Sequence, residues 1–335
     1  MDYEYTRRVW RALGMPEIDP GTPDFDEVDV ETLKSLKQLI DSGLDPEAVI
    51  ANARVYGQAF ARIAEVDARL FRQLYAGDDT ITLEGAVEAL LQATQLPREY
   101  TLRRHATLAV RDIVMSTSGA PSSIQAVGFV DLVDFTQLSM DLHAEDLGQL
   151  VGRFEEIAID SCVNSGSRLV KMIGDAVMFV SAEPTRALAT ARDVVTSVRD
   201  DPGLFEARAG LDFGELLAAG GDYYGNPVNT ASRITGFARS GTVVASEAFA
   251  QKFDDPSLSM HDLGKQVLRG VGPVHLYKLR LPELSTDGVD GGAAAKAGTD
   301  SSEQDAHDAR LKARRLRRKT VKTALDGRKQ ARKKA

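Results

Sequence analysis

The sequence predicts an α+β fold in which an all-α region precedes a domain of mixed strands and helices. Two patterns predict it: apolar residues recur at helical spacing up to about residue 115, and strand patterns alternate with helical ones from about residue 124. An apolar hairpin at residues 168–181 favours a mixed sheet over a doubly wound parallel sheet. With 335 residues, 43% of them hydrophobic, the chain can form two domains of roughly 100–200 residues each and is not wholly disordered.

The first region reads as a series of helices. In residues 29–44, four apolar residues recur every three to four positions: Leu33, Leu36, Leu39 and Ile40. A long helix is expected to open at Asp45–Pro46, because proline suits a first helical turn, and to stop at Gly77. A further helix is expected over residues 83–114, with a break at Pro97.

The second region alternates strands and helices. The expected elements, in order, are a buried strand at 124–133, a helix at 145–165, the hairpin at 168–181 turning at Gly174–Asp175, a helix at 187–198, a strand-like segment at 205–221, a strand-to-helix segment at 226–239, and short strands at 242–246 and 274–279.

Composition sets the boundaries between these parts. Residues 116–123 (STSGAPSS) read as a linker. Residues 282–335 begin with Gly, Ala, Ser and Asp and almost no large apolar side chain, so they cannot offset their ordering entropy and are expected to be disordered. We therefore expect an all-α domain over residues 1–115 and the α+β domain over residues 124–281.

The net charge of −8 combines an acidic body with a basic C-terminus. Residues 310–335 hold 13 Lys and Arg against one acid, Asp326. A solvated charge run is the plain interpretation of this tail, and weak contact with an anionic membrane or with the acidic body of the chain is the alternative. No specific nucleic-acid partner is expected, because the tail has no aromatic residue on which bases can stack.

Other features favour a cytoplasmic protein. The single cysteine, Cys162, excludes an intramolecular disulfide and a cysteine-based zinc cage, which fits a reducing compartment. No apolar stretch approaches the ~20 residues that span a bilayer. The start, MDYEYTRRVW, lacks the apolar core of a signal peptide.

Two aspartates are candidate metal ligands. Asp131 lies inside an apolar strand (GFVDLVDF), and Asp175 lies at the predicted hairpin tip (MIGDAVMF). A carboxylate in such surroundings is costly unless it is paired or metal-bound, and Mg²⁺ prefers one or two carboxylates plus substrate phosphates. Asp175 is explained equally well as a turn residue after Gly174, whereas a strand interior disfavours an aspartate such as Asp131.

Three further polar residues are candidates for contacts with a ligand. Lys171 lies four residues before Asp175, and it also fits an edge-strand lysine that prevents aggregation. In GGDYYGNPVNTASR, Asn229 and Arg233 share one face of a helix, where they can orient a ribose oxygen and hold a phosphate. A glycine-rich loop before a helix with an ordinary surface arginine fits the same pattern.

Taken together, three motifs resemble the catalytic domain of class III adenylate and guanylate cyclases. They are FVDLVDFT at residues 129–136, LVKMIGDAVMF at 169–179 and DYYGNPVNTASR at 222–233, in the order and spacing of the family. The resemblance covers residues 124–281. It implies a ferredoxin-like βαββαβ core and a homodimer with its active sites at the subunit interface.

The resemblance implies a role for each matching residue. Asp131 and Asp175 are similar to the pair that binds two divalent ions, Mg²⁺ or Mn²⁺, in each site. Lys171 and Asp222 are similar to the pair that reads the base. Asn229 and Arg233 are similar to the residues that position the ribose and stabilise the transition-state phosphate. Arg269 occupies the position at which many members have a phosphate-binding lysine. In the family, one protomer supplies the metal carboxylates and its partner the other groups.

The base-reading pair indicates ATP as the substrate. Lys171 can donate to the ring acceptor of adenine and Asp222 can accept from its amino group, whereas guanine presents the opposite pattern. Guanylate cyclases of the family typically carry Glu and Cys at these positions. The resemblance implies an adenylate cyclase, in which the ribose 3′-hydroxyl attacks the α-phosphate in line and expels pyrophosphate with the help of two metals.

Two other functions are open to the same sequence. One is a catalytically silent nucleotide-sensing or dimerisation module of the same fold, against which the complete set of site residues argues. The other is a DNA-associated regulator, against which the acidic helical body and the lack of a clear recognition helix argue.

The chain departs from the family pattern in three places. Residues 214–221 (GELLAAGG) form a shorter hairpin than many members carry. Asp134 stands at a position that is often small. The segment LRGVGP offers Arg269 but no lysine for the phosphates.

The helical region, with WRALGMPEIDP, resembles the regulatory domain of soluble actinobacterial adenylate cyclases. In those enzymes the domain mediates dimerisation and inhibits the catalytic domain at neutral pH, which implies pH-dependent autoinhibition here. A helix ending near Val114 and joined to Ile124 by a short linker can set the separation of two catalytic domains. His105 lies in that helix and is of the residue type that changes charge near neutral pH, although an ordinary surface histidine is the commoner explanation.

Overall fold

The structure is a computed structural model, which describes residues 3–16, 27–74, 82–115, 122–135, 139–140, 142–204, 206–253 and 258–279. Contacts within the chain divide it into two units, residues 1–120 and 121–335. Residues 116–121 of the predicted linker and the predicted disordered tail, 282–335, lie outside the described residues.

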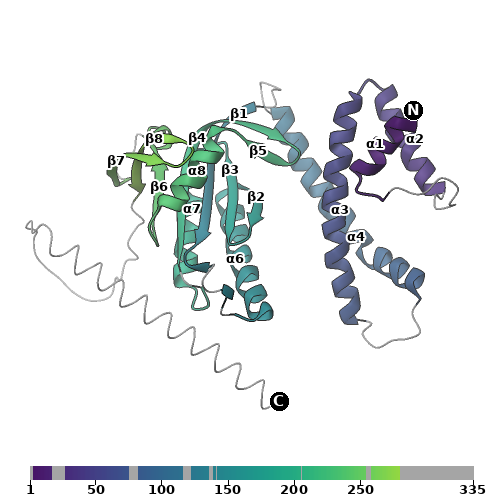
Figure 1. Cartoon of the computed structure of the whole chain (residues 1–335), viewed down its shortest axis with the longest axis horizontal. Helices are drawn as coiled ribbons and strands as arrows, with labels where there is room; N and C mark the ends of the chain where they lie inside the picture. The colour runs from purple at the N-terminus through teal and green to yellow at the C-terminus, as the bar shows by residue number, and fades with distance from the viewer. Residues whose placement is uncertain are drawn as a thin grey trace, which may run out of the picture. The chain divides into compact units, whose positions relative to one another are not determined.

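The described part of the N-terminal unit is helical. Its helices are α1 (Tyr3–Ala12), α2 (Glu27–Asp41), α3 (Pro46–Leu74) and α4 (Leu83–Met115) (Figure 1). The predicted start of α3 is confirmed, because the carboxylate of Asp45 accepts a hydrogen bond from the backbone N–H of Ala48 at 3.2 Å and so caps the helix. No helix among the described residues is long and apolar enough to cross a membrane.

The helices α1 and α3 form the core of this unit. Val9, Ile50 and Ala53 are buried together. Gly57 allows the chain leaving α1 to approach closely, since a Cβ atom at this position would lie 2.3 Å from the carbonyl oxygen of Leu13.

The predicted break at Pro97 is wrong. The helix α4 runs through Pro97, although a proline leaves the carbonyl four residues earlier without its N–H partner. The guanidinium of Arg98 donates to the carbonyl oxygens of Leu91 at 3.1 Å and Thr94 at 3.2 Å. Neither oxygen is the carbonyl of Ala93, four residues before the proline, so these bonds lie on both sides of the missing one and do not replace it.

The second unit is built on one sheet with the strand order β2-β3-β1-β4-β6-β8-β7, and β5 pairs with β4. Its strands are β1 (Ser122–Leu132), β2 (Arg168–Ile173), β3 (Ala176–Ser181), β4 (Ala207–Ala219), β5 (Asp222–Tyr224), β6 (Val243–Ser246), β7 (Met260–Leu268) and β8 (Gly272–Leu279). Its helices are α6 (Ala144–Ser165), α7 (Pro184–Asp200), α8 (Asn226–Phe237) and α9 (Glu247–Ala250). The run β1-α6-β2-β3-α7-β4 forms a ferredoxin-like core, so the predicted α+β class is confirmed.

Most predicted elements of this unit are present, and some details differ. The hairpin of β2 and β3 turns at Gly174–Asp175 as predicted. The strand β1 begins at Ser122, inside the predicted linker. The segment 226–239 holds no strand among its described residues, because α8 occupies it and the short strand β5 precedes it. The strand β7 was not predicted, since its sequence, MHDLGKQVL, shows no clear alternation.

Helices cover both faces of the sheet. Residues of α6 and α7 pack with Val130 of β1, and Ala231 of α8 packs with Phe129 on the opposite face. The helix α8 lies directly on β4 because Gly210 has no side chain. A Cβ atom at Gly210 would lie 2.3 Å from the backbone nitrogen of Thr235 and 2.5 Å from the carbonyl oxygen of Ala231.

Candidate active site

The two predicted metal ligands lie at the same end of neighbouring strands. Asp131 stands near the end of β1 and pairs in register with Ala176 of β3. Asp175 is the residue just before Ala176, in the turn that follows β2. The backbone carbonyl of Asp175 accepts a hydrogen bond from the N–H of Leu132 at 3.0 Å. The turn therefore closes onto the end of β1 and brings the two aspartates together.

The closeness of these carboxylates is visible in their electrostatics. Burial, and next the charge of Asp131, raise the pKa of Asp175 above its usual value, while its own backbone and the guanidinium of Arg208 act in the opposite direction. Like charges held this close favour the uptake of a proton or of a cation. The pair is thus suited to bind positive charge.

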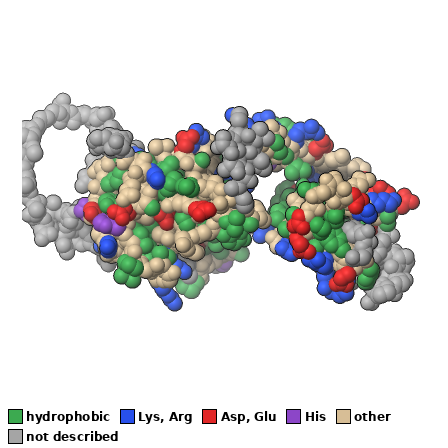
Figure 2. Space-filling view, turned by 90° about the horizontal axis from the view of Figure 1, so that it is seen from above, with side chains coloured by type: hydrophobic (Ala, Val, Ile, Leu, Met, Phe, Trp, Pro, Cys, Tyr) green, Lys and Arg blue, Asp and Glu red, His purple; other side chains and the backbone are tan. Residues whose placement is uncertain are grey.

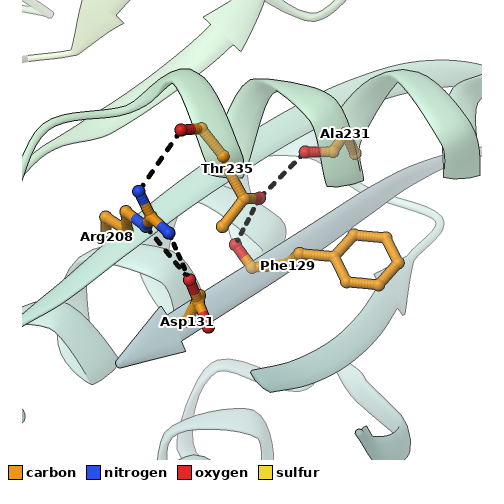
Figure 3. A network of polar contacts seen from close by, with 6 residues as sticks. Phe129, Asp131, Arg208, Ala231 and Thr235 are labelled. Carbon is orange, nitrogen blue, oxygen red and sulfur yellow. Dashed lines mark hydrogen bonds and ion pairs between the residues drawn. The ribbon is translucent and has the colours of Figure 1, made fainter. Parts of the chain in front are cut away.

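Arg208 of β4 already supplies one positive charge to this pair. Its Nε and Nη2 atoms donate to Oδ2 of Asp131 at 3.0 and 2.7 Å (Figure 3). Its Nη1 atom donates to the carbonyl oxygen of Gly236, at the end of α8, at 3.2 Å. Arg208 was not among the predicted site residues. It faces Asp131 only through the β1–β4 register, which the sequence does not display.

A hydrogen bond close to Asp131 also holds α8 against β1. The hydroxyl of Thr235 donates to the carbonyl oxygens of Ala231 at 2.8 Å and Phe129 at 3.3 Å (Figure 3). Since Phe129 lies two residues before Asp131, α8 and the predicted metal site share the last residues of one strand.

The donor set fits a hard divalent cation. Two carboxylates and one guanidinium leave the group formed by Asp131, Asp175 and Arg208 with net negative charge when the carboxylates are ionised. No cluster of three or more His, Cys, Asp or Glu that could hold a metal is found in the described part of the chain. An ion bound here would take its remaining ligands from oxygens other than a third carboxylate, such as those of water or substrate, which is the pattern that Mg²⁺ prefers. Binding of two ions stays a prediction.

The predicted base-reading residues contact each other within one chain. The Nζ atom of Lys171 forms an ion pair with Oδ2 of Asp222, which joins β2 to β5. Their side chains are 41% and 24% exposed, so the pair is accessible to a ligand. The other carboxylate oxygen of Asp222 accepts a hydrogen bond from the backbone N–H of Tyr223 at 2.8 Å, which fixes the orientation of the carboxylate.

The other predicted residues lie on exposed surfaces. The helix α8 presents Asn229 and Arg233 on its exposed side and buries Ala231 and Ile234. Arg269 is exposed in the turn between β7 and β8, at the edge of the sheet opposite β2. One chain therefore does not bring Arg269 to the aspartate pair, and the roles of these residues stay predictions.

A buried carboxylate that the sequence did not indicate lies under α8. Asp212 of β4 is 7% exposed. It accepts hydrogen bonds from the hydroxyl of Ser246 and from the backbone N–H of Phe213, the latter at 2.8 Å. Burial raises the pKa of Asp212, and the hydrogen bonds with Ser246, Phe213 and Thr230 act against that rise. Because Thr230 belongs to α8, this electrostatic contact places Asp212 next to the helix that carries Asn229.

Asp175→Asn is expected to stabilise the metal-free protein. A raised pKa means that the folded state binds more protons than the unfolded state, so the contribution of Asp175 to stability falls as pH rises. Removal of that charge should raise the melting temperature near neutral pH by about 1–3 °C, and the gain should vanish as pH falls below the unfolded pKa of about 3.9, where the carboxyl becomes protonated in both states. Thermal unfolding in a chelator measures this. A melting temperature unchanged from wild type at neutral pH would contradict the expectation, and Asp160→Asn on the exposed side of α6 is the control.

Comparison with known families finds two matches that divide the chain as the structure does. Residues 121–280 match the family described as the adenylate and guanylate cyclase catalytic domain. Residues 1–93 match the adenylate cyclase regulatory domain.

Individual proteins match over both parts. An adenylate cyclase of Streptomyces coelicolor is 33% identical over 258 residues, which cover 74% of this chain and 68% of that protein. A pH-sensitive adenylate cyclase of Mycobacterium tuberculosis is 30% identical over 319 residues, which cover 88% of this chain and 78% of that protein. Among solved structures, the adenylyl cyclase CyaB from P. aeruginosa aligns with a TM-score of 0.43 and 22% identity, over 48% of this chain and 94% of that one.

Proposed function

The chain belongs to the family of adenylate and guanylate cyclases and is an adenylate cyclase, and we propose that it converts ATP into 3′,5′-cyclic AMP and pyrophosphate in sites shared by two copies of the chain. One observation carries the proposal: the catalytic unit holds both a carboxylate pair suited to divalent cations, Asp131 and Asp175, and an accessible lysine–aspartate pair, Lys171 and Asp222. The first pair suits a triphosphate with its metal ions, and the second suits a purine edge.

The choice of ATP follows from hydrogen-bond polarity. The ammonium of Lys171 only donates hydrogen bonds and the carboxylate of Asp222 only accepts them. Adenine offers a ring acceptor beside an amino donor, which complements the pair. Guanine offers a ring N–H beside a carbonyl oxygen, so each side chain would face a group of its own kind, and such mismatches discriminate strongly.

The residues of the chain account for the reaction. Asp131 and Asp175 hold Mg²⁺ or Mn²⁺, which when bound lowers the pKa of the ribose 3′-hydroxyl and neutralises the phosphates. Asn229 orients the ribose for in-line attack on the α-phosphate. Arg233 meets the charge that develops on the α-phosphoryl oxygens. Arg208, beside the same carboxylates, meets the charge of the triphosphate, and Arg269 adds a further cation for it.

A homodimer supplies what one chain lacks. Within one chain, Arg269 stands at the far edge of the sheet from β2, and Asn229 and Arg233 point outward from α8. In the proposed dimer these groups complete the site of the partner. The helical unit offers a surface for dimerisation, since hydrophobic side chains are exposed on it among charged ones (Figure 2). On α3 they recur every three to seven positions, as Tyr56, Phe60, Ile63 and Leu70.

The N-terminal unit is proposed to inhibit the catalytic unit in a pH-dependent manner. The match of residues 1–93 to a regulatory domain and the likeness to a pH-sensitive adenylate cyclase support this. The full chain and residues 120–285 are expected to differ in their pH–rate profiles, with the shorter protein more active near pH 7. Identical profiles would end this part of the proposal.

We further propose that the protein is cytoplasmic and that its basic residues 310–335 make weak contact with anionic membranes. The excess of Lys and Arg in that segment supports the second point. Cosedimentation with anionic vesicles that is lost at high salt and on deletion of the segment would support the contact. Cell fractionation tests the location.

A specificity exchange tests the central proposal. The purified chain with Mn²⁺ is expected to form cyclic AMP from ATP and little cyclic GMP from GTP. Lys171→Glu with Asp222→Cys removes the donor and acceptor that match adenine, so the ratio of kcat/KM for ATP to that for GTP should fall by about a hundredfold or more. Both cyclic products are measured by chromatography. Wild-type protein that forms no cyclic nucleotide, or a double variant with an unchanged ratio, would refute the proposal.

A further inference from the structure

The strands β2 and β5 approach each other without sharing a backbone ladder. Among the described residues, β2 pairs only with β3, and β5 pairs only with β4. Two side-chain contacts join them: the ion pair of Lys171 with Asp222, and a contact of Arg168 with Tyr223. The proposed base-reading pair therefore lies across a junction that side chains hold.

In the contact of Arg168 with Tyr223, the tyrosine is buried and the arginine is exposed. The Nη1 atom of Arg168 donates to the hydroxyl of Tyr223 at 3.4 Å, and the guanidinium carbon lies 5.8 Å from the centre of the tyrosine ring. Tyr223 is 8% exposed and packs with Val127 of β1 and Met178 of β3. Arg168 is exposed, so the tyrosine anchors the contact and the arginine closes it from outside.

A β-bulge in β2 makes the arrangement possible. Residues three apart in a regular strand point to opposite faces, so Arg168 and Lys171 would normally diverge. In this strand Arg168 pairs with Val180 and Lys171 with Met178, and Val170 is the extra residue. Because Val180 and Met178 are two apart, both basic side chains point to one face, toward β5. Bulges next to active sites often redirect side chains in this way.

We propose that Arg168 and Tyr223 are positioning residues for recognition of the base. The inference rests on the proposed function, in which Lys171 and Asp222 separate and turn toward the adenine edge. When their ion pair opens, the contact of Arg168 with Tyr223 remains to hold β5 against β2. It sets the spacing at which Lys171 and Asp222 meet the base, and a displacement of about 1 Å is enough to cost activity. Neither Arg168 nor Tyr223 contacts the substrate in this role.

Kinetics of single and double variants of the full chain test the proposal. Arg168→Met and Tyr223→Leu are each expected to lower kcat/KM for ATP by about threefold to tenfold, mainly through KM, and to lower the ATP-to-GTP ratio by a similar factor. Arg168→Lys and Tyr223→Phe should lose less, because each keeps part of the contact. The double variant Arg168→Met/Tyr223→Leu should be no worse than the worse single variant, since both break one contact.

The control is Arg186→Met, which removes an exposed arginine paired with Glu183 on α7 and should leave the nucleotide ratio unchanged. Equal losses for ATP and GTP, or losses that multiply in the double variant, would overturn the proposal. If the larger changes prevent folding, Arg168→Lys and Tyr223→Phe decide the question by the same ratio. A wild-type chain without preference for ATP would refute the proposed function itself. A wild-type preference for ATP that is unchanged in the variants would refute only the positioning role of Arg168 and Tyr223.

Discussion

Asp175→Ala is expected to lower cyclic AMP formation by more than about a hundredfold, because it removes one of the two carboxylates proposed to hold the divalent cations. Asp175 stands in a turn whose backbone closes onto β1 beside Asp131, so no neighbouring side chain on that turn replaces the lost oxygen atoms. The loss should appear in kcat at saturating Mn²⁺ and ATP. The assay is formation of cyclic AMP by the purified full chain, and Asp160→Ala on the exposed side of α6 is the matched control.

The same variant tests whether sites are shared between copies. Asp175→Ala and Arg233→Ala chains are each expected to be inactive alone. When they are mixed in equal amounts, half of the dimers carry one intact site of two, so about a quarter of the wild-type activity should return. No recovery after verified exchange of subunits would show that each site is built from one chain. An Asp175→Ala chain that keeps its activity alone would refute the assignment of the metal ligands.

Gly210→Ala is expected to destabilise the catalytic unit by about 2–4 kcal/mol. The added methyl group would meet backbone atoms of α8, at 2.3 Å from the nitrogen of Thr235 and 2.5 Å from the carbonyl oxygen of Ala231. Backbone atoms cannot rotate away as a side chain can, so α8 must shift as a whole. Since α8 carries Asn229 and Arg233, the shift should also reduce kcat in the protein that remains folded.

Gly152→Ala provides a control of opposite sign. Gly152 lies inside α6, and nothing lies within 4 Å of a Cβ atom placed there. Its replacement should stabilise the protein by about 0.5–1 kcal/mol, since alanine favours the helix. Urea unfolding followed by circular dichroism measures both changes. A Gly210→Ala variant as stable as wild type would show that α8 does not rest on β4 as closely as described.

Local patterns in the sequence predicted most of the fold. The hairpin around Gly174–Asp175 and the cap at Asp45 depend on residues adjacent in the chain, and both are confirmed. The continuous helix at Pro97 was predicted wrongly, because the rule that a proline breaks a helix considers that residue alone, and α4 runs through it. The backbone explains why the position of Asp134 is often occupied by a small residue. Its φ of 63° lies in the left-handed region, where small residues cause the least steric strain.

Site residues that belong to sequence motifs could be predicted, whereas contacts that depend on the register between strands could not. The resemblance gives Lys171 and Asp222 one role, the reading of the base, and the structure places their side chains in an ion pair, while the role itself stays a prediction. Arg208 reaches Asp131 only because β4 pairs with β1 in one register, and the bulge at Val170 appears only in the pairing of β2 with β3. Such pairings join segments far apart in the chain and have no local signature.

The two ion pairs of the site have a consequence for how the enzyme is assembled. Asp131 is matched by Arg208 and Lys171 by Asp222, and both matches are made inside a single copy of the chain. A single subunit can therefore fold with none of these four side chains needing a partner from another chain. Asp175 forms no ion pair with another described residue, and this is where we expect a cation to bind. In the proposed dimer, a second subunit adds residues beside these ion pairs, and we expect nucleotide and cations to bind by replacing the electrostatic partners that each side chain has within one chain.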